Sequence, residues 1–160
     1  MVLICYDGSP DAKTAITLAG RLLQGHPAIV LTVWEPFMEV MTRTPSGFGM
    51  APGMVNVDEI DTANEQGAHA RAEEGVKLAA EAGLNAQPRC RSQVTSVADA
   101  ILDEAAAVGA DAIVIGSRGL TGIKSVLLGS VSHHVIQHAD RAVIVVPSAE
   151  IAAARARRKH

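Results

Sequence analysis

The sequence predicts an α/β fold, with a single open five-stranded parallel sheet and helices on both of its faces. Short apolar runs alternate with longer segments whose apolar residues recur every three or four positions, as in amphipathic helices. Such alternation favours parallel strands joined by right-handed crossovers. The 160 residues are 48% hydrophobic but only 2% aromatic. Val, Ile, Leu and Ala must therefore build the core, as is usual in a parallel sheet covered by helices.

The first half of the chain holds two expected strands, residues 2–6 and 29–34. Ser9 is a good N-cap and Pro10 suits the first helical position. We therefore expect a helix between these strands, ending around Gly25. A longer helical pattern follows over residues 58–82 and ends at a glycine.

The second half continues the alternation. Residues 86–93 form a weak third strand, and Pro88 together with two arginines favours an edge position for it. Thr95 or Ser96 caps the next helix, which extends to about Val108. The remaining elements are strands at residues 112–115 and 142–146 and a helix at residues 130–139.

This pattern predicts one domain over residues 1–147, with a mobile loop at about 37–57. The loop is rich in proline, glycine and methionine, and both a disordered excursion and a binding lid fit it. Residues 148–160 form a basic tail, expected as a short helix or a disordered segment.

Charge and composition exclude several classes of protein. The net charge is −3 and the isoelectric point is about 6.0, which argues against a nucleic-acid-binding surface. Cys5 lies inside an apolar run and is expected as a small buried side chain, so no disulfide with Cys90 is predicted. No apolar run approaches the ~18 residues of a membrane span, and the cytoplasm is the expected compartment.

A glycine pattern carries the strongest functional signal. Gly116 and Gly119 follow the fourth strand, and Gly129-Ser130 comes after nine intervening residues, at the start of a helix. Backbone N–H groups at a helix N-terminus lack intrahelical partners and favour an anion, and glycine lets the backbone approach it closely. The pattern predicts a phosphate site, although glycines also end strands for structural reasons alone.

Asp7 is the second candidate, because it follows the first strand. Ligands of open parallel sheets bind beyond the carboxyl ends of the strands, where the strand order reverses. If the first and fourth strands are neighbours, Asp7 and the loop from Gly116 face one crevice. The alternative is an ordinary turn residue in Asp7-Gly8.

Together, Tyr6-Asp7-Gly8-Ser9 and the G-x2-G-x9-G-[ST] spacing resemble the ATP-binding branch of the universal stress protein family. The resemblance extends from Leu3 to Pro147. It implies a Rossmann-like fold similar to the adenine nucleotide alpha hydrolases. The turn at residues 92–96 departs from the Gly-Asp-Pro-like turn of many members, which leaves the role of that turn open.

The resemblance also implies a role for each matching residue. Asp7 would bind the ribose hydroxyls, and the backbone of Val33 would meet the adenine edge. Gly116 and Gly119 would let the chain pass under the ribose and the phosphates. The phosphates themselves would be held by Gly129, Ser130, Val131 and Ser132.

Other candidate residues have two interpretations each. Arg118 and Lys124 either neutralise phosphate charge or are solvated. His134 and His138, four positions apart, either supply two ligands to a metal ion or, as we expect, form a surface or dimer-facing pair. Because no nucleophile and base are paired in the sequence, we assign no catalytic residue and no metal ligand.

The predicted function is that of an ATP-binding stress protein, with or without Mg²⁺, acting as a sensor or regulator for an unknown protein partner. Like the family, it is expected to form a homodimer through the strand at residues 142–146, and proline at Ile144 should then give monomer or aggregate. The alternatives are a slow ATPase or self-phosphorylating protein, a binder of AMP or a cyclic nucleotide, and a structural dimer with an empty site.

Overall fold

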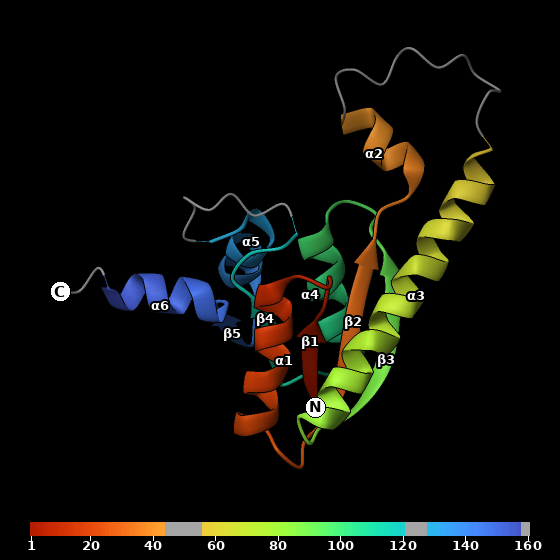
Figure 1. Ribbon diagram of the computed structural model, residues 1–160. Coiled ribbons are helices and arrows are strands. Elements are labelled where there is room, and N and C mark those ends of the chain that lie inside the picture. The colour runs from red at the N-terminus through yellow and green to blue at the C-terminus, as the bar shows by residue number, and fades with distance from the viewer. Residues whose placement is uncertain (44–55, 121–127, 158–160) are drawn as a thin grey trace.

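A computed structural model of the chain describes residues 1–43, 56–120 and 128–157. It has one parallel sheet of five strands in the order β3-β2-β1-β4-β5 (Figure 1), which confirms the predicted fold class. The strands are β1 (Val2–Cys5), β2 (Pro27–Trp34), β3 (Asn85–Ser92), β4 (Ala112–Gly116) and β5 (Ala142–Val146). The helices are α1 (Pro10–Leu22), α2 (Phe37–Arg43), α3 (Val57–Glu81), α4 (Val97–Ala107), α5 (Ser130–His138) and α6 (Ala149–Arg157).

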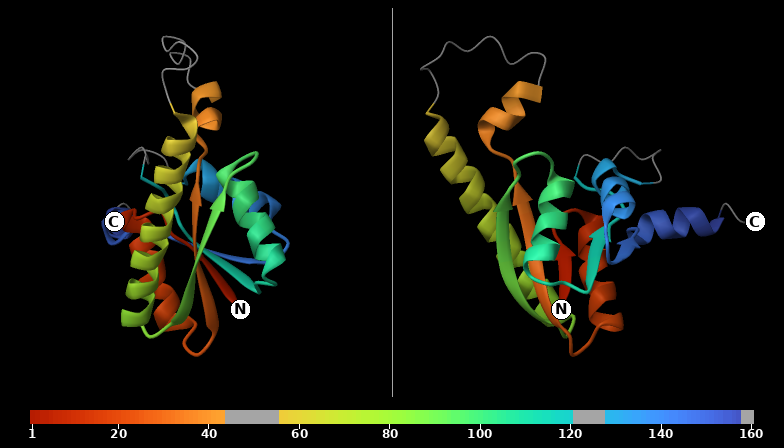
Figure 2. Two further views of the ribbon diagram at one scale, coloured as in Figure 1. Left: turned by 90° about the vertical axis from the view of Figure 1, so that its right-hand side faces the viewer. Right: turned by 180° about the vertical axis from the view of Figure 1, so that it is seen from behind.

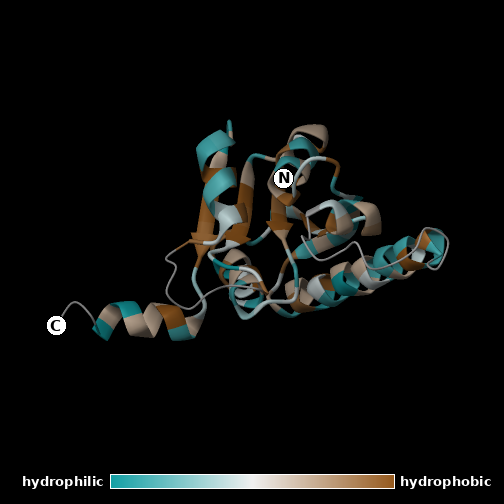
Figure 3. Cartoon of the chain, turned by 90° about the horizontal axis from the view of Figure 1, so that it is seen from above, coloured by the Kyte–Doolittle hydropathy of each residue, from teal (hydrophilic) through white to brown (hydrophobic). Residues whose placement is uncertain are grey.

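Helices cover both faces of the sheet (Figure 2). Alternate residues of each strand point to opposite faces. In β1, Val2 and Ile4 join the cluster under α1 and α3, whereas Leu3 and Cys5 join the cluster under α4 and α5. Figure 3 shows the hydrophobic strands enclosed by helices with hydrophilic residues. This two-sided burial explains why the central strands β1 and β4 are continuous apolar runs.

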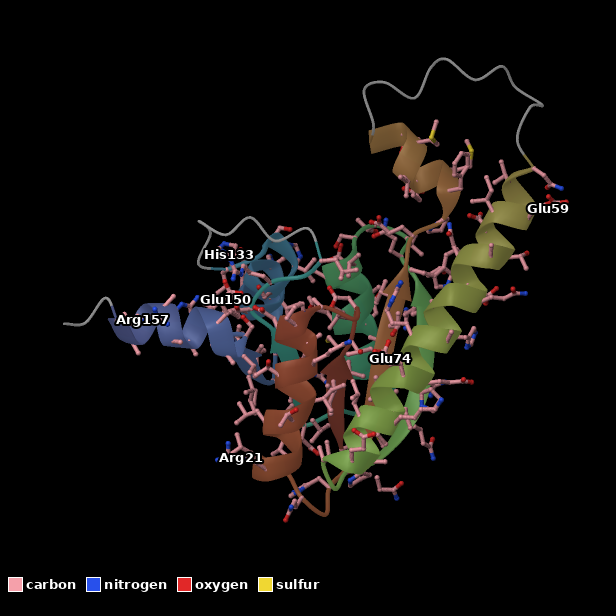
Figure 4. The ribbon with its side chains drawn as sticks, in the orientation of Figure 1. Arg21, Glu59, Glu74, His133, Glu150 and Arg157 are labelled. Atoms are coloured by element: carbon pink, nitrogen blue, oxygen red, sulfur yellow. The ribbon has the colours of Figure 1, made fainter. Side chains whose placement is uncertain are left out.

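Helices α1 and α3 approach each other closely on one face. A Cβ added to Gly20 of α1 would lie 2.3 Å from the Ala82 carbonyl oxygen, just after α3. Lys13 of α1 pairs with Glu74 of α3 at 3.2 Å (Glu74 is labelled in Figure 4). Small side chains on both helices make this spacing possible.

One part of the predicted loop at 37–57 is helical. The short helix α2 follows Pro36, and the Phe37 N–H donates to the Asp61 carboxylate of α3 at 2.7 Å. The sequence analysis did not foresee this helix, because its distant partner leaves no local sequence signal. The mobility of the loop stays a prediction. Residues 44–55 lie outside the described part of the chain, so the lid prediction is not tested.

The tail forms a helix over Ala149–Arg157, one of the two expected possibilities. It has no buried residue and extends away from the body of the protein, as the positions of Glu150 and Arg157 in Figure 4 show. In the three described segments, no helix is both long and apolar enough to cross a bilayer.

Strand β5 lies at one edge of the sheet, beside β4. The Ser117 N–H donates to the Val146 carbonyl at 2.8 Å, so the backbone groups of Val146 point toward β4. Successive residues of a strand point their backbone groups to opposite edges. Ile144 therefore also bonds toward β4, whereas Val143 and Val145 present theirs to the open edge.

Candidate functional site

The centre of the sheet contains the point where the strand order reverses. As predicted, β1 and β4 are neighbours, with Val2 beside Ala112 and Ile4 beside Val114. The chain leaves β1 for α1 on one face and leaves β4 for α5 on the other. Such a divergence opens a crevice beyond the carboxyl ends of the two strands.

A cleft of about 450 Å³ lies at this point. Its volume is within the range of sites for small molecules. All the residues that the sequence analysis selected for ligand binding line it. They are Asp7, Val33, Gly116, Gly119, Gly129, Ser130, Val131 and Ser132.

The N-terminus of α5 is open toward a ligand. Gly129 is its N-cap and supplies no side-chain hydrogen bond, and the first turn of this helix has no acidic residue. By contrast, α1 and α4 are capped by Ser9 and Ser96, with Asp11 and Asp99 in their first turns. The first N–H groups of α5 therefore keep their partial positive charge for an external anion.

The loop between β4 and α5 is braced by hydrogen bonds. The Ser117 carbonyl accepts from the Gly129 N–H at 2.8 Å and from the Ser132 hydroxyl at 2.9 Å. Ser132 is only 2% exposed, whereas Ser130 is exposed. In this structure the Ser132 hydroxyl therefore supports the loop, and its predicted contact with a phosphate remains a prediction.

Asp7 connects the two sides of the cleft. One of its carboxylate oxygens accepts from the Ser9 N–H at 2.9 Å and the other from the Leu120 N–H at 3.2 Å. A Cβ added to Gly119 would lie 2.8 Å from Asp7 Oδ2, so a larger residue there would displace the carboxylate from this position. The half-buried carboxylate retains acceptor capacity for further donors.

Val33 presents backbone groups to the cleft. The backbone hydrogen bonds between the β1 and β2 segments extend as far as the bond from the Tyr6 N–H to the Leu31 carbonyl, at 2.8 Å. The Tyr6 carbonyl then accepts from the buried Thr32 hydroxyl at 2.9 Å. Leu31 and Val33 point their backbone groups to the same edge of β2. The N–H and C=O of Val33 therefore face the space beyond the end of β1. A donor beside an acceptor suits the edge of a purine.

Several apolar side chains of the lining were not assigned to the site by the sequence analysis. They include Cys5, Leu31, Val97, Ile101, Ile115 and Leu128. Burial, and then the charge of Asp7, raise the pKa of the Cys5 thiol to about 12. The thiol therefore stays protonated at neutral pH and acts as an apolar wall instead of a nucleophile.

The two histidines of α5 form a stacked pair beside α4. The ring centroids of His134 and His138 are 4.1 Å apart, and His134 Nε2 lies 3.2 Å from Asp99 Oδ1. The sequence did not indicate this contact, because Asp99 and His134 are 35 positions apart in the chain. Among residues 1–43, 56–120 and 128–157, no group of three or more His, Cys, Asp or Glu side chains could hold a metal ion.

The pair between Asp99 and His134 predicts a pH effect on stability. The Ser96 hydroxyl, and next the His134 ring, hold the pKa of the Asp99 carboxyl below its ordinary value. A lowered carboxyl pKa stabilises the fold above the unfolded value of about 3.9, and this contribution is lost as the pH falls through the folded value. We expect Asp99→Asn to lower the Tm at pH 6 but not near pH 2, as thermal melts followed by circular dichroism would show.

A matched control for this variant is Asp58→Asn, which removes a first-turn carboxylate of α3. If both variants lower the Tm at pH 6 by the same amount, the interaction with the helix dipole explains the effect, and the contact with His134 does not.

Comparison with known proteins identifies the family. A family model described as the universal stress protein family matches residues 1–147. The chain belongs to the universal stress protein family. A universal stress protein of Thermus aquaticus is 33% identical over 150 residues, which cover 91% of this chain and 96% of the relative. Universal stress protein YxiE of Bacillus subtilis is 31% identical over 146 residues, which cover 91% and 97%.

Solved structures of universal stress proteins share the fold. UspA from Lactobacillus plantarum superposes with a TM-score of 0.70 at 23% identity, over 91% of this chain and 95% of that one. The protein from Archaeoglobus fulgidus in complex with dAMP gives 0.60 at 22% identity, over 91% and 95%. A family member from Arabidopsis thaliana with AMP bound gives 0.64 at 17% identity, over 94% and 93%. Another, in complex with cAMP, gives 0.63 at 24% identity, over 92% and 96%.

Two further candidates of the sequence analysis have different outcomes in this universal stress protein. Arg118 lines the cleft. Lys124 lies outside the described residues. In the turn that departs from the family pattern, Ser96 caps α4 by accepting from the Asp99 N–H at 3.0 Å.

Proposed function

We propose that the chain binds an adenine nucleotide in the cleft between β1 and β4, with ATP as the expected ligand. The observation that carries the proposal is that all the residues selected from the sequence line one cleft that ends at an uncapped helix N-terminus. A binding protein of this kind would serve as a nucleotide-dependent sensor or regulator in the stress response, with a protein partner that responds to the bound state.

The cleft offers a distinct environment to each part of a nucleotide. The apolar walls and the backbone of Val33 suit the purine, and the Asp7 carboxylate suits the vicinal ribose hydroxyls. The N–H groups at the start of α5 suit the phosphates. Mg²⁺ would then accompany ATP on its phosphate oxygens.

A second candidate ligand is AMP or a cyclic nucleotide. Three proteins of the same fold were solved with dAMP, AMP and cAMP. These ligands share the purine and the sugar with ATP and differ at the phosphate end, so the same cleft would accept their nucleoside part.

The first experiment is to denature protein purified without added nucleotide and to identify the released small molecules by mass spectrometry. Stoichiometric ATP supports the sensor proposal. Release of AMP or a cyclic nucleotide favours the second candidate, and ADP calls for a Mg²⁺-dependent turnover assay to measure slow hydrolysis. If nothing is released, calorimetric titration with each nucleotide decides. Binding that is absent in the wild type, or unchanged in Gly129→Val, would contradict the proposed site.

We further propose that β5 pairs with its counterpart in a homodimer, because β5 is an edge strand whose Val143, Ile144 and Val145 are only half-buried. The structure refines the choice of variant. Ile144→Pro would break bonds to β4 inside the subunit, whereas Val145→Pro removes an N–H that points to the open edge. We expect Val145→Pro to be a folded monomer by light scattering, and a dimer of unchanged affinity would contradict this interface.

Residues 1–147 are proposed as the nucleotide-binding unit and residues 148–160 as a separate basic tail. The exposed helix α6, with Arg155 and Arg157 in its last turn, is the described part of this tail that a partner would meet. The cytoplasm is proposed as the compartment, where the free thiols of Cys5 and Cys90 would stay reduced.

A further inference from the structure

Asp11 is a buried carboxylate that the binding proposal does not use. It lies in the first turn of α1 and is only 5% exposed. A carboxylate buried to this degree requires hydrogen-bond donors. Both donors given by the structure come from the loop after β4: the Ser117 hydroxyl at 2.7 Å and the Arg118 N–H at 3.0 Å, each to Asp11 Oδ2.

The same loop continues this connection to α5. As described above, the Ser117 carbonyl accepts from the Gly129 N–H and from the Ser132 hydroxyl. A series of hydrogen bonds thus runs from the start of α1, through Ser117, to the N-cap and first turn of α5. It joins residues more than a hundred positions apart in the sequence.

Close packing fixes the same contact sterically. A Cβ added to Gly116 would lie 2.9 Å from the Asp11 Cβ and 2.9 Å from the Ala12 nitrogen. The end of β4 and the first turn of α1 are therefore in direct contact, and the Asp11 carboxylate reaches the loop without occupying the cleft. Among the described residues that line the cleft, Asp11 does not appear.

We infer that Asp11 is a positioning residue: through Ser117 it sets the place of the α5 N-terminus, and with it the affinity for the phosphate end of the nucleotide. The inference rests on the proposed nucleotide binding and adds a residue that acts on one part of the ligand only. The nucleoside end depends on Val33, which lies in β2, and on Asp7. Asp7 accepts from the Leu120 N–H of the loop, but it also accepts from the Ser9 N–H of its own turn, which a shift of the loop does not remove.

The test compares ATP with adenosine, the nucleoside without phosphates, by calorimetry and by competition. Asp11→Ala is expected to weaken the binding of ATP about 10- to 100-fold, because it removes the acceptor of the buried Ser117 hydroxyl and of the part-buried Arg118 N–H, which hold the loop in place. The binding of adenosine to the same variant should weaken less than about threefold. Ser117→Ala is the milder variant, and the double variant should bind ATP no worse than Asp11→Ala alone, since both changes break one connection. Asp11→Asn, which keeps an acceptor oxygen, should recover part of the affinity. Asp58→Ala, in the first turn of α3, is the control and should leave both affinities unchanged.

Hydrogen exchange without nucleotide supplies a second readout. In Asp11→Ala the amide of Gly129, which donates to Ser117, is expected to exchange faster than in the wild type. If Asp11→Ala binds ATP and adenosine more weakly by the same factor, or binds neither more weakly than the wild type does, the inference is overturned. If the wild type binds neither ligand while the Gly129 amide still exchanges faster in the variant, the proposed function fails but the connection to α5 stands. If the wild type binds neither ligand and the exchange is unchanged, both fail.

Discussion

Replacing Asp7 by alanine is expected to weaken the binding of ATP about 10- to 100-fold. A hydrogen bond to a charged group contributes about 1.5–3 kcal/mol, and each 1.4 kcal/mol changes the affinity about tenfold. The Asp7 carboxylate lies in the cleft and is oriented by the N–H groups of Ser9 and Leu120. Its remaining acceptor capacity is what the proposal assigns to the ribose. Isothermal titration of both proteins with ATP measures the difference.

A ligand without the ribose hydroxyls tests this assignment independently of protein stability. We expect 2′,3′-dideoxy-ATP to bind the wild type about as weakly as ATP binds Asp7→Ala. The variant should not weaken the dideoxy ligand further, because the interacting partner is already absent. If Asp7→Ala weakens both ligands by the same factor, Asp7 supports the loop at Gly119 and does not bind the ribose.

Replacing Gly20 by valine is expected to lower the free energy of unfolding by about 3 kcal/mol or more. A Cβ at this position would lie 2.3 Å from the Ala82 carbonyl oxygen and 2.6 Å from the Ala82 Cβ. Because the nearest atom is backbone, no change of rotamer relieves the overlap, and α1 and α3 would have to separate. Urea denaturation measures the loss, and an unchanged midpoint would contradict the close approach of the two helices.

Gly67 provides the matched control, because it is also a helical glycine. A Cβ at Gly67 of α3 would meet nothing within 4 Å. Gly67→Ala should therefore stabilise the protein by about 0.5–1 kcal/mol, through helix propensity alone. Opposite signs at the two glycines would separate packing from propensity.

Most of the fold could be predicted because its signals are local. Ser9 and Ser96 cap α1 and α4 as expected, and the positive φ of Gly83 follows the end of α3. Pro88 correctly placed β3 at an edge. The helix α2 could not be predicted, because its Phe37 N–H is bonded to a residue 24 positions away.

The candidate site divides in the same way. The glycine spacing and the Asp at the end of β1 are readable patterns, and the structure brings these residues to one cleft. Leu31, Ile101 and Ile115 could not be assigned to the site, because in a sequence an apolar wall residue is indistinguishable from a core residue. Asp11 is hidden for a different reason: its partners are 106 and 107 residues away.

The buried face of α3 consists of Ala68, Ala72, Gly75 and Ala79. A Cβ at Gly75 would already lie 2.7 Å from Val30 Cγ1 and 2.9 Å from the Tyr6 ring. The packing of this face is therefore limited by the volume of its side chains, whereas the polar contacts of α3, such as Lys13 with Glu74, lie outside it. Substitutions accepted on that face should be limited by size, whereas the exposed face should accept large residues. The protein is thus open to engineering along the outer side of its longest helix, with little room for enlargement on the inner side.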